Sequence, residues 1–319
     1  MAALTLKERG ILSGYLTVLF GFLAIYFLDP SIKLFVDGWN EYLEGAIFDR
    51  PCAYFPPISI LDFCGSLLVC KYYRLNVVGT KSWFEILFTC TLMQFGGTTI
   101  VSIVFLGHCP GWIIGQAAFP ALLLTWWLTF YSPGDVYWKF IQNSNTIELI
   151  AGFFSAIASG HAIGSWGMDK AMHNKYHVHG ESFGSSYLLC ILAGSIAASG
   201  GGLLTQAFNL LGTNHSYTLR HTPPFFVAGQ YNASATLNRS FLLSVLYYYL
   251  ISDASTFLPS PKISLVTAHS LMSLIHLVIF FISVQLPTVD VFQVISGFLL
   301  KLLHIDPTLK LERKVVKQD

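Results

Sequence analysis

Charged side chains are scarce in this chain. Only 11% of its 319 residues are Asp, Glu, Lys or Arg, whereas a typical soluble domain has about 25%. The hydrophobic fraction is 54% and the mean hydropathy is +0.58. A water-soluble fold of this size needs more charge to cover its surface, so the composition argues against a cytosolic enzyme and predicts an integral membrane protein.

An excess of charge of either sign is also missing. The chain has 18 Lys and Arg against 17 Asp and Glu, a net charge of +1. Proteins that bind nucleic acid present a basic field, so we predict no nucleic-acid partner. Intrinsic disorder requires low hydrophobicity and high net charge. The high hydrophobic fraction and low net charge of this chain therefore exclude it as well.

Motifs for catalysis and metal binding are absent too. The sequence contains no nucleophile elbow, His-Glu-x-x-His motif, phosphate loop or dinucleotide fingerprint, and the six cysteines form no Cys-x-x-Cys pair. We therefore predict no enzyme activity, no cofactor and no metal site. Cys52 and Cys109 both fall on one predicted side of the membrane, where pairing in an oxidising compartment stays an open alternative. His173, His177 and His179 share a loop and are interpreted as loop histidines, with a transition-metal site as the lesser alternative.

Long apolar runs are what the sequence does have. A membrane-spanning helix needs about 20 mostly apolar residues, and eight stretches approach that length. They are residues 12–28, 55–70, 84–106, 116–138, 147–168, 183–211, 241–258 and 263–286. The first lacks a small-residue cleavage site, so we interpret it as a retained helix.

The distribution of Lys and Arg predicts the orientation of these spans. With eight spans, thirteen of the 18 basic residues fall on the side that holds both termini, and five fall on the other side. Basic residues favour the cytosolic side, or the matrix side in mitochondria. After the last span, apolar residues recur at helical spacing between Val289 and Leu303, which predicts an interfacial amphipathic helix followed by a basic tail.

Histidines and glycines inside the spans are the candidate functional residues. His161 lies in the fifth span, and His269 and His276 lie in the eighth. Intramembrane ionisable groups often mark pathways, although a hydrogen-bonded structural histidine is the alternative for each. Glycine-rich segments interrupt the third span at Gly96 and Gly97 and the sixth span from Ser199 through Gly200 and Gly201. Such breaks line an aqueous path or permit close helix packing.

Six short motifs, in order, resemble the trimeric intracellular cation channels, the seven-helix monovalent-cation channels of endoplasmic and sarcoplasmic reticulum. The motifs are Phe55-Pro56 with its span ending near Tyr72, the segment 93–97, the segment 131–139, the His-containing turn 176–180, the glycine-rich segment 194–202 and the Pro-containing turn 258–262. The resemblance covers about three quarters of the chain.

The resemblance implies an all-α membrane bundle of about eight transmembrane helices, seven of them arranged as in that family. It divides the chain into an extra N-terminal helix and loop (1–40), a channel-like core (41–286), and an amphipathic helix with a basic tail (287–319). It also implies a homotrimer with a potassium-conducting pore in each protomer, in the endoplasmic reticulum or another intracellular membrane. The pore residues would be Gly96, Gly97, His161, Ser199, Gly200 and Gly201.

One departure from the family motivates a second hypothesis. The family's fourth helix carries basic residues that hold a phosphoinositide head group, and the corresponding stretch here has Ser155 and Ser159 instead. These two serines mark the expected lipid-binding position. The loss of its basic residues supports the alternative of a non-conducting structural subunit of a larger membrane complex, in the mitochondrial inner membrane for example.

Overall fold

The computed structural model is almost entirely helical. It describes residues 6–48, 55–77, 79–174, 177–178, 181–182, 184, 186–211, 231–252, 262–286 and 292. The α-helices are α1 (Leu6–Leu28), α2 (Pro30–Gly45), α3 (Ile60–Asn76), α4 (Trp83–Ile100), α5 (Gly111–Ile114), α6 (Ala118–Tyr131), α7 (Val136–Gln142), α8 (Asn145–Ile163), α9 (Asp169–Met172), α10 (Tyr187–Ala207), α11 (Tyr231–Ile251) and α12 (Leu265–Gln285). The other elements are π-helices η1 (Val101–Phe105) and η3 (Gly164–Met168), a short 3₁₀ turn η2 (Pro133–Asp135), and two hairpins, β1 (Ile47–Phe48) with β2 (Ile58–Ser59) and β3 (His177–Val178) with β4 (Glu181–Ser182).

The predicted membrane spans all contain a helix. Four helical segments in the described part of the chain are long and apolar enough to cross a membrane on their own, namely Trp83–Phe105, Asn145–Met172, Tyr187–Ala207 and Leu265–Gln285. A fifth results if α1 and α2, bent by 105° at their junction, form one broken span. The all-α membrane fold is therefore confirmed, and the count of eight spans stays a prediction.

The segment after the first span was predicted to be a loop, which is wrong. It forms helix α2, which begins at Pro30. The Asp29 side chain accepts hydrogen bonds from the backbone N–H of Ser31 (2.8 Å) and of Ile32 (3.4 Å), so it caps the new helix. An Asp at the cap followed by a proline in the first turn starts a helix. The same two residues that end α1 therefore begin α2.

The fourth predicted span, 116–138, is divided in two. Helix α6 ends at Tyr131, and α7 begins at Val136. Between them Gly134 and Asp135 both have positive φ, 64° and 58°, which a helix cannot accommodate. The apolar run continues across this turn, and hydropathy alone therefore does not reveal it.

The interruption of two spans by glycine was also predicted, and the helices do not break there. Helix α10 is continuous from Tyr187 to Ala207, and α4 continues through Gly96 and Gly97 to Ile100. Only after Ile100 does the helix widen into η1. The glycines instead lie where α4 and α10 touch, because a Cβ on Gly200 would be 2.4 Å from the Cα of Gly97.

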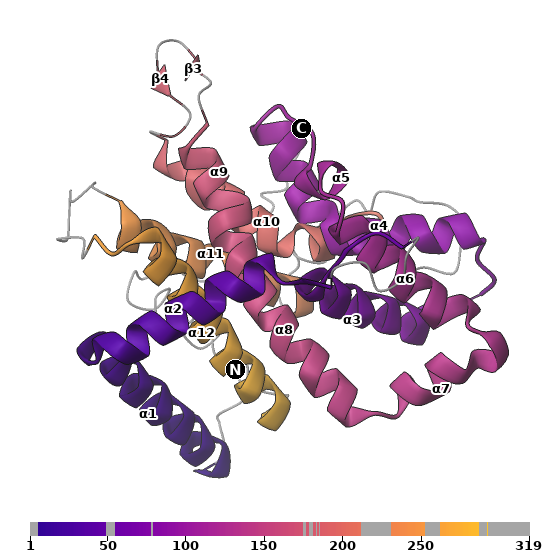
Figure 1. Cartoon of the computed structure of the whole chain (residues 1–319), viewed down its shortest axis with the longest axis horizontal. Coiled ribbons are helices and arrows are strands. Elements are labelled where there is room, and N and C mark those ends of the chain that lie inside the picture. Colours follow the sequence, from indigo (N-terminus) through magenta and orange to yellow (C-terminus); the bar gives the residue numbers. More distant parts are fainter. Residues whose placement is uncertain are drawn as a thin grey trace, which may run out of the picture.

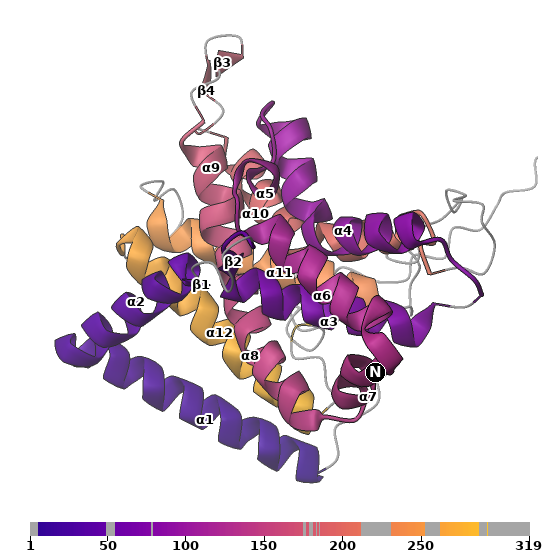
Figure 2. The same cartoon turned by 45° about the vertical axis from the view of Figure 1, so that its right-hand side comes forward.

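The bundle is organised around α8 and α10. Helix α10 packs on α4 and α11, α12 packs on α8, and α3 packs on both α6 and α8. Figures 1 and 2 show α8 in the middle of the molecule, α1 at its edge and the β3–β4 hairpin projecting away from the helices. The largest hydrophobic cluster joins α10, α11 and α12 with η1 and η3, and includes the fully buried Tyr247 and Met272. Apart from Phe292, the predicted amphipathic helix and basic tail lie outside the described residues, as do Cys52 and His179.

Candidate permeation cavity and the polar cluster beside it

A cavity of about 500 Å³ lies among α3, α4, α8 and α10. Its lining contains polar side chains among apolar and small ones. The polar residues are Glu44, Ser59, Asp62, Gln94, Thr98, Gln116, Ser155, Ser159 and Lys170, accompanied by Trp112 and Trp166. Intramembrane polar side chains in helical bundles face the bundle interior or water-filled spaces, so this cavity is the first candidate for a functional site.

Helix α8 contributes its wall through residues at helical spacing. Ser155, Ala158, Ser159 and Ala162 recur three or four positions apart and therefore share one face. All four side chains are small, which leaves room next to the helix. The Ser159 hydroxyl donates to the Ser155 carbonyl oxygen at 2.9 Å. The two serines predicted as a lipid-binding position thus line the cavity with hydroxyl groups.

Helices α3 and α4 supply the opposite polar wall. Gln94 and Thr98 are one turn apart on α4, and Asp62 lies near the start of α3. The Gln94 side chain packs against Gly65, since a Cβ there would be 2.8 Å from Gln94 Nε2. Asp62 and Glu44, the latter on α2, contribute two carboxyl groups to the lining of the cavity. Lys170 contributes one amine. Carboxylates and amide or hydroxyl oxygens are ligands suited to cations.

The glycines predicted to form the pore lie beside this cavity and do not line it. The contact between α4 and α10 is formed by Gly96, Gly97, Gly200 and Gly201. The residues of α10 that line the cavity are Ala197 and Ala198. Ser199 is 2% exposed and its hydroxyl donates to the Ser195 carbonyl oxygen at 2.6 Å. These glycines therefore allow the close approach of α4 and α10, and their role in a pore stays a prediction.

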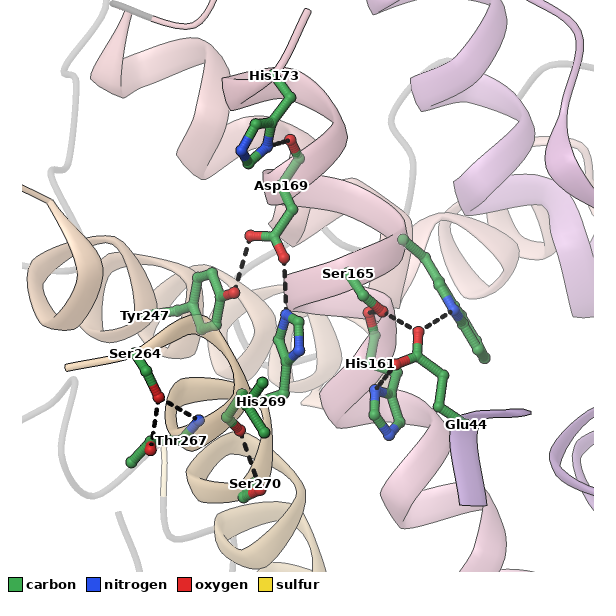
Figure 3. A network of polar contacts seen from close by, with 12 residues as sticks. Glu44, His161, Ser165, Asp169, His173, Tyr247, Ser264, Thr267, His269 and Ser270 are labelled. Carbon is green, nitrogen blue, oxygen red and sulfur yellow. Dashed lines mark hydrogen bonds and ion pairs between the residues drawn. The ribbon is translucent and has the colours of Figure 1, made fainter. Parts of the chain in front are cut away.

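His161, the sixth predicted pore residue, belongs to a largely buried polar cluster next to the cavity. Its ring is fully buried, and Nδ1 lies 3.2 Å from Oε2 of Glu44. The other oxygen of Glu44 accepts hydrogen bonds from the Ser165 hydroxyl (2.5 Å) and from Trp166 Nε1 (3.1 Å). Figure 3 shows Glu44 held between these groups and His161. Because Glu44 also lines the cavity, it connects the cluster to that space.

A second carboxylate, Asp169, continues the cluster. One of its oxygens lies 2.7 Å from His269 Nε2, and the other accepts a hydrogen bond from the Tyr247 hydroxyl at 2.8 Å. The Tyr247 and His269 rings stack, with centroids 5.8 Å apart, and the His161 and His269 rings are 6.0 Å apart. Side chains from α2, α8 with η3 and α9, α11 and α12 thus meet at one place (Figure 3).

The geometry of η3 makes this meeting possible. Ser165 and Trp166, which hydrogen-bond Glu44 of α2, both lie in this π-helical turn, and single π-turns are frequent at functional sites. Gly164, the first residue of the turn, leaves room for His269, since a Cβ there would be 2.6 Å from the His269 ring.

His161 and His269 are candidate residues from the sequence, whereas Glu44 and Asp169 were not predicted. Glu44 lies between the first two predicted spans, 12–28 and 55–70, where the sequence predicted no helix. The signal was nevertheless available, because Asp37, Asn40 and Glu44 recur at helical spacing behind the Asp29 cap. Asp169 lies one residue beyond the predicted fifth span, 147–168.

Comparisons with known proteins agree with the fold. No family model and no curated protein matches the chain. Two solved structures of a trimeric intracellular cation channel from C. elegans are similar to it. The one without Ca²⁺ has a TM-score of 0.50 at 19% identity, covering 80% of this chain and 98% of that one. The one with bound Ca²⁺ has a TM-score of 0.54 at 16% identity, covering 78% and 96%.

A third structure, described as a TRIC counter-ion channel in calcium release, has a TM-score of 0.51 at 19% identity and covers 75% of this chain and 93% of its own. At these identities the likeness establishes the fold. The resemblance seen in the sequence motifs is thereby confirmed at the level of fold. The chain is an integral membrane protein with the fold of the trimeric intracellular cation channels.

Proposed function

We propose that the protein is a divergent member of the trimeric intracellular cation channels and conducts monovalent cations, potassium in particular. Each protomer would conduct through its own helical bundle. The observation that carries the proposal is the cavity of about 500 Å³ lined by Asp62, Gln94, Thr98, Ser155 and Ser159. Polar side chains are costly within a membrane unless they pair or contact water, and here five of them face one space.

The oxygen-bearing side chains around the cavity suit cations. Asp62 and Glu44 bring two carboxyl groups, and Lys170 brings one amine. Rings of carboxylates select cations in many channels, and backbone or hydroxyl oxygens replace part of the hydration shell of the ion. We therefore replace the sequence-based pore along the glycines by a path along α3, α4 and α8.

The proposal includes a homotrimer in the endoplasmic reticulum or another intracellular membrane, as the fold of the similar channels suggests. It does not include a phosphoinositide site at Ser155 and Ser159. Head-group phosphates are bound by charge-assisted hydrogen bonds from Arg or Lys, and hydroxyl groups occupy these positions.

Planar-bilayer recording of the purified full-length protein tests the proposal. Potassium currents are expected from wild type, with a clearly lower unitary conductance for Asp62→Asn. Asp135→Asn is the matched control, because Asp135 is outside the cavity and pairs with Arg74. Silent wild-type protein of correct size and helicity would overturn the proposal, and so would equal conductance in both variants.

A second candidate is a non-conducting structural subunit of a larger membrane complex, mitochondrial for example. The direct contact of α4 with α10 at Gly97 and Gly200 favours it, since the glycines serve packing there. Purification from native membranes separates the two: a fixed place in a large assembly supports the structural role, and an isolated trimer supports the channel.

A further inference from the structure

We propose that Glu44, His161 and His269 bind a divalent transition-metal ion, Zn²⁺ in the first instance. The three side chains come from α2, α8 and α12. One ligand atom from each lies within 4.8 Å of the others. Two imidazoles and one carboxylate are a frequent ligand set for Zn²⁺ with an open fourth position.

The distance between the first two ligands already suits a metal. Nδ1 of His161 and Oε2 of Glu44 are 3.2 Å apart. Two ligands at tetrahedral angles, each about 2.0–2.1 Å from Zn²⁺, are separated by about 3.4 Å. The ligand atom of His269 lies within 4.8 Å of the other two and would have to come closer on metal binding.

His161 supplies an independent observation in favour of a ligand. The side chain is fully buried, and neither ring nitrogen makes a hydrogen bond to the described residues; Nδ1 has only the contact with Glu44. Buried polar atoms nearly always have a partner. A bound metal ion would give this imidazole one.

The surrounding groups orient the other two ligands. His269 directs Nε2 to Asp169 at 2.7 Å, and Asp169 is held in turn by the Tyr247 hydroxyl. We assign the Nε2 proton to this hydrogen bond, which leaves Nδ1 of His269 as the metal ligand. Carboxylate–histidine pairs of this kind hold the ring of a ligand in place in many zinc sites.

Glu44 is oriented in the same manner. Its Oε1 accepts hydrogen bonds from Ser165 and Trp166, so Oε2 faces His161 (Figure 3). Glu44 and Trp166 also line the cavity. The ion therefore has a route of entry, and a water molecule from the cavity would complete its coordination.

Direct binding to the full-length protein in detergent tests this site. Chelator-treated wild type is titrated with Zn²⁺, and bound metal is counted after gel filtration. The expected result is one Zn²⁺ per chain, with at least a tenfold loss of affinity in each of Glu44→Gln, His161→Gln and His269→Gln. His173→Gln and the double change His177→Gln/His179→Gln are matched histidine controls and should bind as wild type.

A spectroscopic measurement on wild type keeps the test decisive if a variant fails to fold. Co²⁺-loaded protein should show visible d–d bands without the sulfur-to-metal band of a cysteine ligand, and X-ray absorption of the Zn²⁺ form should show two imidazoles. Wild type that binds no Zn²⁺ would overturn the proposal. Sulfur ligation, or binding lost in the loop-histidine controls, would do the same. Because the readout is bound metal, it is independent of whether the protein conducts.

Discussion

Gly97 of α4 and Gly200 of α10 meet backbone to backbone. A Cβ on Gly200 would lie 2.4 Å from the Cα of Gly97, and a Cβ on Gly97 would lie 2.3 Å from the Ile196 carbonyl oxygen. Both distances are to backbone atoms, which cannot rotate away. The two helices can therefore approach this closely only because both positions lack a side chain.

Gly200→Ala should destabilise the bundle by pushing α4 and α10 apart. Overpacking of a well-packed core costs about 1–3 kcal/mol, so thermal unfolding in detergent should shift to lower temperature. Gly202→Ala is the matched control two residues away on the same helix, because a Cβ there meets nothing within 4 Å. Equal unfolding temperatures for the two variants would contradict the contact.

The ion pair between α3 and α8 gives a prediction about buried charge. Lys71 Nζ lies 2.8 Å from Glu148 Oε2; the Lys71 side chain is 10% exposed and the Glu148 side chain 58%. Glu148→Gln leaves a nearly buried ammonium group without its partner and should cost about 1–2 kcal/mol, less than for a fully buried pair because Glu148 reaches solvent.

Lys71→Met removes the buried charge instead of isolating it, and should cost less than Glu148→Gln. Chemical unfolding of both variants and of the double variant measures the difference. The ion-pair interpretation fails if the lysine change is the more damaging of the two.

Asp135 follows the end of α6 and should contribute to acid sensitivity. The hydrogen bond from Arg74 at 2.7 Å holds the pKa of its carboxyl below the ordinary 3.8. A carboxyl whose pKa is lower in the folded state stabilises the protein above the unfolded-state pKa and loses that contribution as the pH falls through the folded-state value. Wild type should thus exceed Asp135→Asn in unfolding temperature at neutral pH, and the gap should close below about pH 3.8.

Salt and the arginine partner provide the checks on this prediction. Both groups reach solvent, so added salt should shrink the gap at neutral pH. Arg74→Lys should be more damaging than Asp135→Asn, because Arg74 also hydrogen-bonds the Thr129 carbonyl oxygen and lies over the Trp138 ring at 4.4 Å. A pH-independent gap would show that the carboxyl charge plays no part.

Filling the cavity should block conduction if the proposed path is correct. Ser159→Phe places a ring among the lining residues and should abolish or strongly reduce potassium current in bilayers. Ser283→Phe, at an exposed serine of α12, should conduct as wild type. Undiminished current in a correctly folded Ser159→Phe protein would move the path elsewhere.

Local properties of the chain account for what could be predicted from sequence. The hydropathy and the length of an apolar run are set by residues adjacent in the sequence. The all-α membrane fold and the positions of the main helices could therefore be predicted from these runs. The order of short motifs indicated the channel fold. Where a local signal was ambiguous the prediction was wrong: Asp29-Pro30 both ends α1 and caps α2, and the turn at Gly134 and Asp135 lies within an apolar run.

The site depended on contacts that no local pattern contains. Ser165 and Glu44 are 121 residues apart in the chain, and His269 and Asp169 are 100 residues apart. The amino-acid sequence by itself determined that this chain lies in a membrane as a helical bundle, because its low charge leaves no other solvent for so much apolar surface. Tertiary structure alone decided that the glycines join α4 to α10 and that Glu44 meets the buried His161, with His269 nearby. Packing between helices that are far apart in the sequence determines which polar groups face one another.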